Sequence, residues 1–274
     1  MKSYVKLVNF EINRFFKLYL ILMGLTIVCQ VFGAIIFSKG YMISANRIIY
    51  ENQLSVSQYT EQYGTFSFDH FFSSGWIEIP IYFCIAMLTI YVFFIWYRDW
   101  FGKNTFIYRL LMLPTERINI YFAKLTTIML LVLGLITMQI LLILIDMQIV
   151  NSIVPADYRT YFSIFENNHL DLWLLLYPNT FIEFIMMYGF GLIFVAVLFT
   201  AILFERSYRL KGIFFAIVYG MLSFGVFITP FLLAGNTSYF YPLEIFLMVI
   251  GASILVLGSA IWIANHLLKH KIRV

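Results

Sequence analysis

Residues 97–124 read YRDWFGKNTFIYRLLMLPTERINIYFAK and separate two long apolar runs of the chain. Four apolar side chains in this stretch recur at helical spacing: Phe106, Ile107, Leu110 and Leu111. That spacing predicts a short amphipathic helix with one apolar face and one polar face. Pro114 disfavours helical geometry at Leu113, so the helix is expected to end there, and Thr115 is a suitable cap for the next helix. The stretch therefore predicts a short helix, an elbow and the start of a membrane span.

The composition excludes a soluble globular protein. Of the 274 residues, 62% are hydrophobic and only 12% are charged, with a mean hydropathy of +0.88. A soluble domain carries about 25% charged residues. The apolar residues form blocks close to the ~20 residues that cross a ~30 Å hydrocarbon core as a helix, and none alternates as the strands of a membrane barrel do. We therefore predict an all-α, polytopic membrane protein.

Six apolar runs are long enough to span a bilayer, and we place them at residues 18–37, 76–96, 119–145, 179–204, 213–234 and 245–265. Residues 1–17 divide into an apolar and a polar side on a helical wheel, which predicts an interfacial helix lying flat on the inner leaflet. A charged flank without such a helix is the alternative. No repeat or linker divides the chain, so residues 1–274 are expected to form a single transmembrane domain.

The distribution of cationic residues predicts the orientation. Fifteen of the 18 lysines and arginines fall in the two terminal tails, in residues 97–124 or in residues 205–211. The three exceptions lie between other runs: Lys39, Arg47 and Arg159. By the positive-inside rule, both termini and residues 97–124 are cytoplasmic, in a multi-pass protein of the plasma membrane.

The two outer segments, residues 39–75 and 147–177, are long and rich in aromatic residues. These include Tyr59, Tyr63, Phe66, Phe68, Phe71, Phe72, Tyr161, Phe162, Phe165 and Trp173. One interpretation is a set of short helices folded against the membrane surface or over an exit. The other is a belt of aromatic side chains at the membrane interface. The sequence alone leaves both interpretations open.

The chain lacks the motifs of an ATP-hydrolysing enzyme. A phosphate-binding loop requires G-x-x-x-x-G-K-[ST], but Gly102 and Lys103 are followed by Asn104, and no glycine lies five residues before Gly102. His266 and His270 have helical spacing without the carboxylate of an H-E-x-x-H site, so we assign no metal ligands. We therefore expect no catalytic residue and no cofactor on this chain.

Three residues inside the apolar runs are candidates for a translocation path. Glu183 lies about one turn inside the fourth run, where a carboxylate is costly and often faces the bundle interior or water. A structural hydrogen bond or contact with the outer interface is the alternative. Gln139 is an amide inside the third run, and Met187 is an adaptable side chain inside the fourth. Hydrogen bonding between helices and contact with lipid are the alternatives for these two.

The layout of the runs and the segment YRLLMLPTERINIYFAKL, residues 108–125, resemble the permease subunits of ABC transporters of the type-2 exporter family. The resemblance implies that the segment between the second and third spans is a coupling helix that docks on an ATPase subunit. The matching residues are Phe101, Phe106, Ile107, Arg109, Leu110, Leu111, Pro114, Glu116 and Arg117. It also implies two copies of an ATP-binding subunit that carries ATP and Mg²⁺, and a dimer with a second permease, identical or paralogous.

From these observations and this resemblance, the expected function is the permease subunit of an ATP-driven exporter in a bacterial cell membrane. Outer segments without a large soluble domain resemble those of bacterial exporters of peptides, bacteriocins or toxins. The many phenylalanines and methionines, with Glu183 as the strong charge inside the spans, favour an amphipathic and cationic substrate over a sugar or an ion. A secondary transporter or channel is the second interpretation, and an intramembrane hydrolase is the third. The lipid bilayer surrounds the chain, and no nucleic-acid partner is expected.

Overall fold

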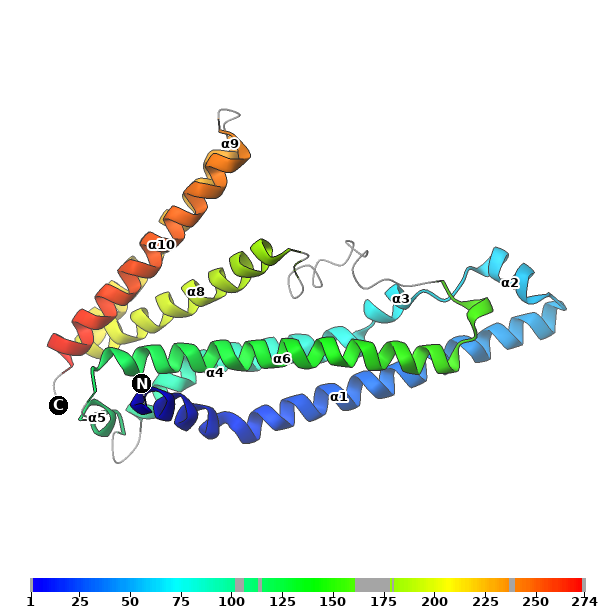
Figure 1. The fold of residues 1–274 in the computed structure, drawn as a ribbon, viewed down its shortest axis with the longest axis horizontal. Helices are drawn as coiled ribbons and strands as arrows, with labels where there is room; N and C mark the ends of the chain where they lie inside the picture. Colours follow the sequence, from blue (N-terminus) through cyan, green and yellow to red (C-terminus); the bar gives the residue numbers. More distant parts are fainter. Residues whose placement is uncertain are drawn as a thin grey trace. The chain divides into compact units, whose positions relative to one another are not determined.

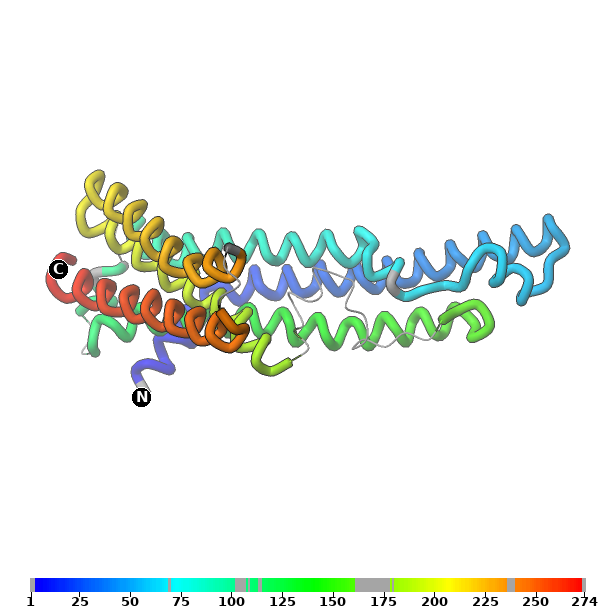
Figure 2. The backbone as a smooth tube through the Cα atoms, turned by 90° about the horizontal axis from the view of Figure 1, so that it is seen from above, coloured from blue at the N-terminus to red at the C-terminus, as the bar shows by residue number. Residues whose placement is uncertain are grey.

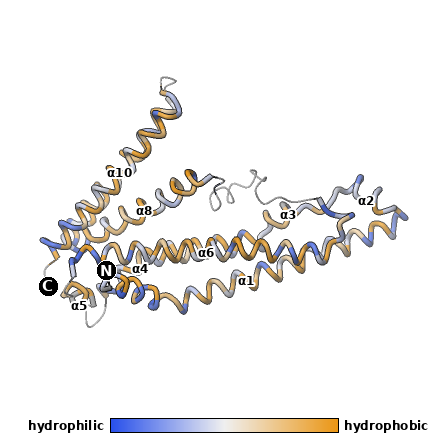
Figure 3. The backbone as a smooth tube through the Cα atoms, viewed as in Figure 1, coloured by the Kyte–Doolittle hydropathy of each residue, from blue (hydrophilic) through white to orange (hydrophobic). Residues whose placement is uncertain are grey.

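The computed structural model of the protein describes residues 2–101, 106–112, 115–160, 178, 180–236 and 240–272. Within these ranges, six helices are long and apolar enough to cross a membrane (Figure 1). They are α1 Lys2–Asn52, α4 Gly75–Trp100, α6 Ile118–Ile153, α8 Phe181–Tyr208, α9 Leu210–Asn236 and α10 Pro242–His266. Figure 3 shows hydrophobic residues along most of each long helix. The prediction of an all-α, polytopic membrane protein is confirmed.

The remaining elements are short. They are α2 Val56–Tyr63, α3 Phe68–Phe72, α5 Phe106–Leu111, the 3-10 helix η1 Ala156–Tyr158 and the π-helix η2 Leu267–Lys271. α2 begins with a capping box: the Ser55 amide donates to the Gln58 side chain at 2.9 Å, and the Gln58 amide donates to the Ser55 hydroxyl at 3.3 Å. Because two amides of its first turn are satisfied in this way, α2 has a defined start.

Each predicted apolar run coincides with a long helix, but the helices extend beyond the runs. α1 continues without interruption from Lys2 to Asn52, so the interfacial helix predicted at residues 1–17 and the first predicted span are parts of one helix. The orientation of its first turns on a membrane stays a prediction. α6 likewise continues to Ile153, past the predicted end at residue 145. Hydropathy marks the length that suits lipid, whereas a helix propagates through its backbone hydrogen bonds and includes polar residues.

The described helices form two compact units. Unit 1 comprises Met1–Asn13, Thr89–Met129 and Thr180–Val274, and unit 2 comprises Arg14–Leu88 and Leu130–Asn179. The helices α1, α4 and α6 contribute residues to both units. The single transmembrane domain expected from the sequence stays a prediction.

In unit 1, the helices α8, α9 and α10 lie side by side (Figure 2). The Thr200 hydroxyl of α8 donates a hydrogen bond to the Ala260 carbonyl of α10, at 3.2 Å. On α8, the fully buried ring of Phe199 meets the fully buried ring of Trp96 on α4 edge to face, with ring centres 5.7 Å apart. These contacts join α8 to α10 and to the end of α4 through side-chain packing and one interhelical hydrogen bond.

The turn between α8 and α9 consists of one residue, Arg209, with φ 55° and ψ −129°. These backbone angles are unfavourable for a residue that carries a side chain. The first turn of α9 approaches the end of α8 so closely that a Cβ atom on Gly212 would collide with the Phe204 carbonyl oxygen. The chain reverses within one residue here because Gly212 has no side chain.

In unit 2, six of the described aromatic residues of the outer segments form a buried cluster, whereas Tyr63 is 55% exposed. Its rings come from α2, α3, η1 and the links beside them: Tyr59, Phe66, Phe68, Phe71, Phe72 and Tyr158. The Phe66 amide donates to the Tyr158 carbonyl at 2.7 Å, and the Thr160 amide donates to the Phe66 carbonyl at 3.1 Å. Because these rings are buried in protein, the folded-segment interpretation is favoured over an interface belt for them. The other aromatic residues of interest lie outside the described residues: Tyr161, Phe162, Phe165 and Trp173.

Candidate functional site

The short helix predicted between the second and third spans is present as α5. Three of its apolar side chains are buried inside the protein, with exposed fractions of 0% for Ile107, 5% for Leu110 and 5% for Leu111. Burial of each such side chain contributes about 1.5–3 kcal/mol. The apolar face of α5 therefore packs against its own chain and is not the surface that is open to a partner.

The exposed residues around α5 are a different set. They are Phe101, Arg109, Met112 and Glu116. Phe101 is 67% exposed and Met112 is 70% exposed, so both provide apolar surface. Arg109 and Glu116 provide exposed charges in the same segment. The side chain of Phe106 and the whole of Pro114 lie outside the described residues. A partner that reaches this segment would meet these exposed residues first.

The predicted cap of α6 is wrong. The Thr115 hydroxyl is buried and has no hydrogen-bond partner in the described part of the chain. The start of α6 is organised instead by backbone bonds of the tighter i to i+3 kind, in which the Asn119 amide donates to the Glu116 carbonyl at 2.9 Å. Because α6 begins at Ile118, its N-cap position is Arg117, and Thr115 lies two residues before the position from which a side chain caps the first turn.

Arg117 lies between α5 and α6 and contacts the end of the chain. Its Nη1 donates to the Leu268 carbonyl at 2.8 Å and to the Ile272 carbonyl at 3.0 Å. The last carbonyls of a helix lack intrahelical partners, and a guanidinium satisfies them well. Leu268 is fully buried beside these bonds. The segment that carries α5 is therefore tied to η2 at the end of α10.

The two ends of this segment are joined by a buried ion pair. The Lys124 ammonium, on a side chain with 0% exposure, donates to Asp99 Oδ2 at 2.5 Å and to Glu11 Oε1 at 2.6 Å. Its third hydrogen bond goes to the Ile95 carbonyl at 2.8 Å. The ammonium also lies 5.3 Å from the centre of the Trp96 ring. All three donors of the ammonium are thus satisfied, which is the condition under which a lysine is tolerated inside a protein.

Glu11 connects the start of α1 to the salt bridge between α4 and α6. Its second oxygen accepts a hydrogen bond from Arg98 Nη2 at 2.9 Å, and its side chain is 3% exposed. The start of α1, the end of α4 and the start of α6 therefore meet in one cluster of charges, which we call the unit 1 ion cluster: Glu11, Arg98, Asp99 and Lys124. Loss of the Lys124 ammonium would leave two buried carboxylates without the cation that both contact, which costs about 3–5 kcal/mol.

The end of α8 is held against the end of α4 by aromatic contacts. The Arg206 guanidinium lies 4.7 Å from the ring centre of Tyr97, 4.8 Å from that of Phe101 and 5.9 Å from that of Trp100. The Tyr97 hydroxyl donates to the Glu205 carboxylate. Cation–π contacts of this kind contribute about 0.5–2 kcal/mol each. Phe101 is therefore held in place although most of its surface is exposed.

Glu183 closes the first turn of α8. Its amide donates to the Thr180 hydroxyl at 3.2 Å, and its carboxylate accepts from the Thr180 amide at 3.3 Å, which together form a capping box. The side chain is exposed. This is the structural hydrogen bond that was the alternative interpretation of Glu183, and a role in a translocation path stays a prediction.

Gln139 is buried in unit 2 and forms a reciprocal pair with Gln30. Each side-chain amide donates to the carbonyl oxygen of the other, at 3.1 Å and 3.0 Å. Met187 belongs to unit 1 and is 37% exposed. The hydrogen-bonding alternative accounts fully for Gln139, because both of its polar groups already have partners inside the protein.

Glu11 was not predicted to belong to any site, and Asp99 was not connected with Lys124. A signal for Glu11 exists in the sequence, because it lies four residues from Leu7 and four from Phe15 in a stripe that is buried in the structure. A carboxylate inside an apolar stripe needs a cation opposite it. Which cation that is depends on which helices pack together, and no local pattern reports this.

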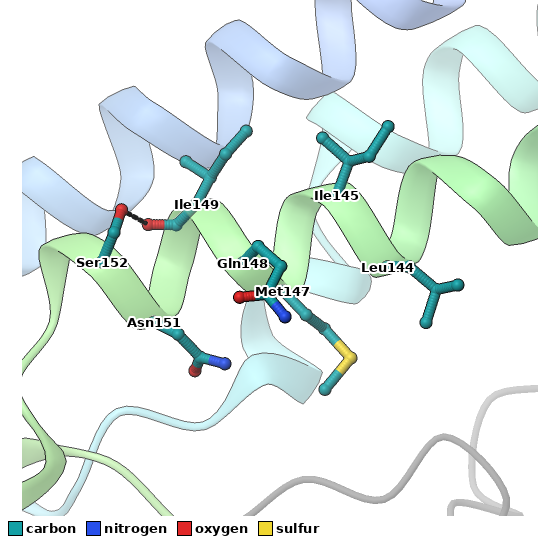
Figure 4. Close-up of a pocket in the computed structure, with 7 residues that line it drawn as sticks. All are labelled: Leu144, Ile145, Met147, Gln148, Ile149, Asn151 and Ser152. Carbon is teal, nitrogen blue, oxygen red and sulfur yellow. Dashed lines mark hydrogen bonds between the residues drawn. The ribbon is translucent and has the colours of Figure 1, made fainter.

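A shallow pocket with a volume of about 630 Å³ lies along α6 in unit 2 (Figure 4). One helix supplies all of its lining side chains: Leu144, Ile145, Met147, Gln148, Ile149, Asn151 and Ser152. The Ser152 hydroxyl donates to the Ile149 carbonyl at 2.7 Å. None of these seven lining residues is charged, and none is a predicted site residue. Among the described residues, no group of three or more His, Cys, Asp or Glu side chains is placed to hold a metal ion.

No protein-family model matches the chain, and neither a curated protein nor a solved structure matches it. The family resemblance of residues 108–125 therefore stands on the sequence pattern alone.

Proposed function

We propose that this chain is the transmembrane subunit of an ATP-driven exporter, with ATP hydrolysed on a separate subunit that contacts the segment around α5. The observation that carries the proposal is the way this segment is anchored. Asp99 and Lys124 join its two ends at 2.5 Å, and Arg117 joins it to the end of α10. A displacement of the segment would therefore move the ends of α4, α6 and α10 together, which is what a motor acting from outside the chain requires.

The proposed contact surface for the ATPase consists of the exposed residues Phe101, Arg109, Met112 and Glu116. This differs from the contact expected from the sequence, in which the apolar face of α5 met the partner. That face is buried, so a charge at Leu110 would disrupt the fold of the segment before it affected any partner. We therefore keep the coupling role in residues 97–124 but assign it to the exposed residues of this segment instead of the buried face of α5.

The wider assembly follows the sequence expectations. We propose two copies of an ATP-binding subunit that carries ATP and Mg²⁺, a second permease that is identical or paralogous, and a bacterial plasma membrane with both termini in the cytoplasm. The cation asymmetry supports this orientation. The proposed substrate is an amphipathic, cationic peptide or toxin, which suits the apolar character of the long helices.

A secondary transporter is the second candidate, and one observation favours it. Asp146 of α6 is a fully buried carboxylate in unit 2, and neither of its oxygens has a hydrogen-bond partner in the described part of the chain. Buried carboxylates in membrane helices often mark ion pathways. The two candidates differ in where the energy comes from, and that difference can be measured.

The test is a site-specific photo-crosslink from the chain in its native membrane. A crosslinker at position 112, introduced as Met112→Cys, should capture a subunit that contains a phosphate-binding loop. The matched control is Met221→Cys on α9, which replaces a methionine that is 69% exposed, close to the 70% of Met112. Capture from 112 and not from 221 supports the proposal. If no nucleotide-binding subunit is captured or co-purified, and transport persists without ATP, the secondary transporter takes its place.

A further inference from the structure

Asp146 differs from every other buried charged side chain in the described part of the chain. Four such side chains are buried: Glu11, Asp99, Lys124 and Asp146. The first three bond to one another in the unit 1 ion cluster. Asp146 belongs to unit 2, has 0% exposure, and has both carboxylate oxygens without a hydrogen-bond partner among the described residues. It is the charge for which the described chain supplies no counterpart.

A second polar group of unit 2 is also buried without a partner. The Ser38 side chain of α1 has 0% exposure, and its hydroxyl makes no hydrogen bond within the described residues. A hydroxyl in a helix usually donates to the carbonyl four residues earlier, as Thr26 does to Leu22 at 2.8 Å on the same helix. Ser38 leaves this bond unmade, so its hydroxyl is available for another group.

The register of α1 and α6 brings Ser38 and Asp146 to the same level. The two helices run in the same direction, since Tyr19 donates to the Leu131 carbonyl and Gln30 bonds to Gln139 further along both. Ser38 follows Gln30 by eight residues and Asp146 follows Gln139 by seven. At ~1.5 Å per residue, both lie about 10–12 Å beyond the amide pair. Because seven residues are close to two full turns, Asp146 shares the face on which Gln139 meets α1.

The surroundings of Asp146 on both helices are apolar. Ile143 and Val150 lie about one turn before and after it on α6, and Ala34 lies one turn before Ser38 on α1. All three belong to one buried hydrophobic cluster, with exposed fractions of 2%, 3% and 0%. An ion taken from water into such surroundings without a partner costs several kcal/mol, so buried charges are paired or bind ions.

We propose that Asp146 and Ser38 form a binding site in unit 2 for one small monovalent cation, Na⁺ or H⁺, that enters from solvent. One carboxylate neutralises one positive charge, whereas a divalent ion would leave an excess charge in the apolar cluster. The carboxylate and hydroxyl oxygens are hard ligands that suit such a cation. Among the described residues, the titratable side chains that belong to this cluster or pack against it are Tyr41, Tyr59 and Tyr158. Lys39, which follows Ser38 on α1, is exposed, and no described cationic side chain of unit 2 is buried.

Occupancy of this site controls how stably α1 packs against α6. With the cation bound, the interior of unit 2 at this level is neutral. Without it, the same packing buries an unpaired charge. Binding of an ion to the folded state alone raises the temperature of unfolding as its concentration rises. The site therefore makes the stability of unit 2 dependent on a solvent cation.

The first measurement is thermal unfolding of the purified full-length chain in lipid nanodiscs, with Na⁺ exchanged for choline at constant ionic strength. We expect the unfolding temperature of the wild type to rise with Na⁺ if Na⁺ is the occupant. Asp146→Asn should abolish this dependence, and Ser38→Ala, which removes one of the two oxygen ligands, should weaken the apparent affinity by about tenfold. The matched control is Asp157→Asn, which removes an exposed carboxylate of the same unit and should leave the dependence unchanged.

The second measurement separates Na⁺ from H⁺. Dicyclohexylcarbodiimide modifies protonated carboxyl groups in apolar surroundings, and mass spectrometry identifies the modified residue. Modification of Asp146 that Na⁺ suppresses assigns the site to Na⁺, and modification that Na⁺ does not affect assigns it to H⁺. A chain with no Na⁺-dependent stability and no modification of Asp146 overturns the proposal. Both measurements use the chain without an ATPase, so their outcome is independent of the proposed function.

Discussion

The two units bury carboxylates in different ways. In unit 1, Glu11 and Asp99 each lie within 2.6 Å of the Lys124 ammonium, so their charges are met inside the protein. In unit 2, Asp146 is equally buried and has no partner among the described residues. Both arrangements occur in helices of similar apolar character. The difference indicates that the unit 1 ion cluster holds helices together, whereas the carboxylate of unit 2 needs something from outside the chain.

The largest expected effect on stability comes from removing the Lys124 ammonium of the unit 1 ion cluster. Lys124→Met should lower the free energy of unfolding by about 3–5 kcal/mol, because Glu11 and Asp99 would lose the ammonium that both contact. Denaturant titration of the purified protein measures the loss. The matched control, Lys17→Met, replaces an exposed lysine of α1 and should change stability little. Equal effects of the two substitutions would show that the cluster contributes nothing to stability.

The same amide substitution should act differently on the two buried aspartates. Asp99→Asn removes a charged hydrogen bond to Lys124 and should lower the free energy of unfolding by about 1.5–3 kcal/mol. Asp146→Asn has no such bond to lose and should leave the stability in Na⁺-free buffer unchanged or raise it. Parallel unfolding curves of the two variants test this. A similar loss in both would mean that Asp146 is paired after all.

The hydrogen-bonded pair Gln30 and Gln139 predicts how a substitution at a paired polar group of unit 2 changes stability. Gln139→Leu leaves the buried Gln30 amide without its partner and should cost about 1–3 kcal/mol. Replacing both residues with leucine should be close to neutral, because neither polar group then remains. A double-mutant cycle gives the coupling energy. Additive losses would contradict the reciprocal pairing and the register of α1 and α6 that follows from it.

The smallest effect is expected at Glu183, an exposed carboxylate at the start of a helix. Glutamine also closes a capping box, so Glu183→Gln should change stability by no more than about 0.5 kcal/mol. Thr180→Ala, which removes the hydroxyl of the same box, should cost about 1 kcal/mol. Export of a cationic amphipathic peptide from cells tests the other role of Glu183. Reduced export by a stable, assembled Glu183→Gln variant supports the translocation path, and unchanged export removes Glu183 from it.

The fold class could be predicted from the sequence because it depends on sums over local windows. Hydropathy located all six long helices, and the apolar spacing in residues 106–111 located α5. The ends of the helices were predicted less well. α1 continues to Asn52 and α6 to Ile153, since polar residues do not stop a helix whose backbone bonds continue.

The candidate site was predicted in part. The spacing that predicted an amphipathic α5 was right, but Ile107, Leu110 and Leu111 face their own chain. An apolar pattern on one side of a helix predicts that this side is buried, but it does not predict whether the same chain or a partner protein buries it. The same limit applies to Glu183, whose capping role depends on how its side chain folds back on Thr180.

Composition, window hydropathy and the cation asymmetry are one-dimensional properties, and they were enough to establish a polytopic helical membrane protein and to predict its orientation. Gln30 and Gln139 are paired although 109 positions separate them in the sequence, and Glu11 and Lys124 are paired across 113 positions. Such contacts depend on which helices pack and in what register, which no local window contains. For the same reason, only the tertiary structure distinguishes Asp99 from Asp146. Asp99 forms a salt bridge with Lys124, whereas the oxygens of Asp146 have no hydrogen-bond partner in the described chain. Burial and pairing are properties of the packed helices, while the residue type is the same at both positions.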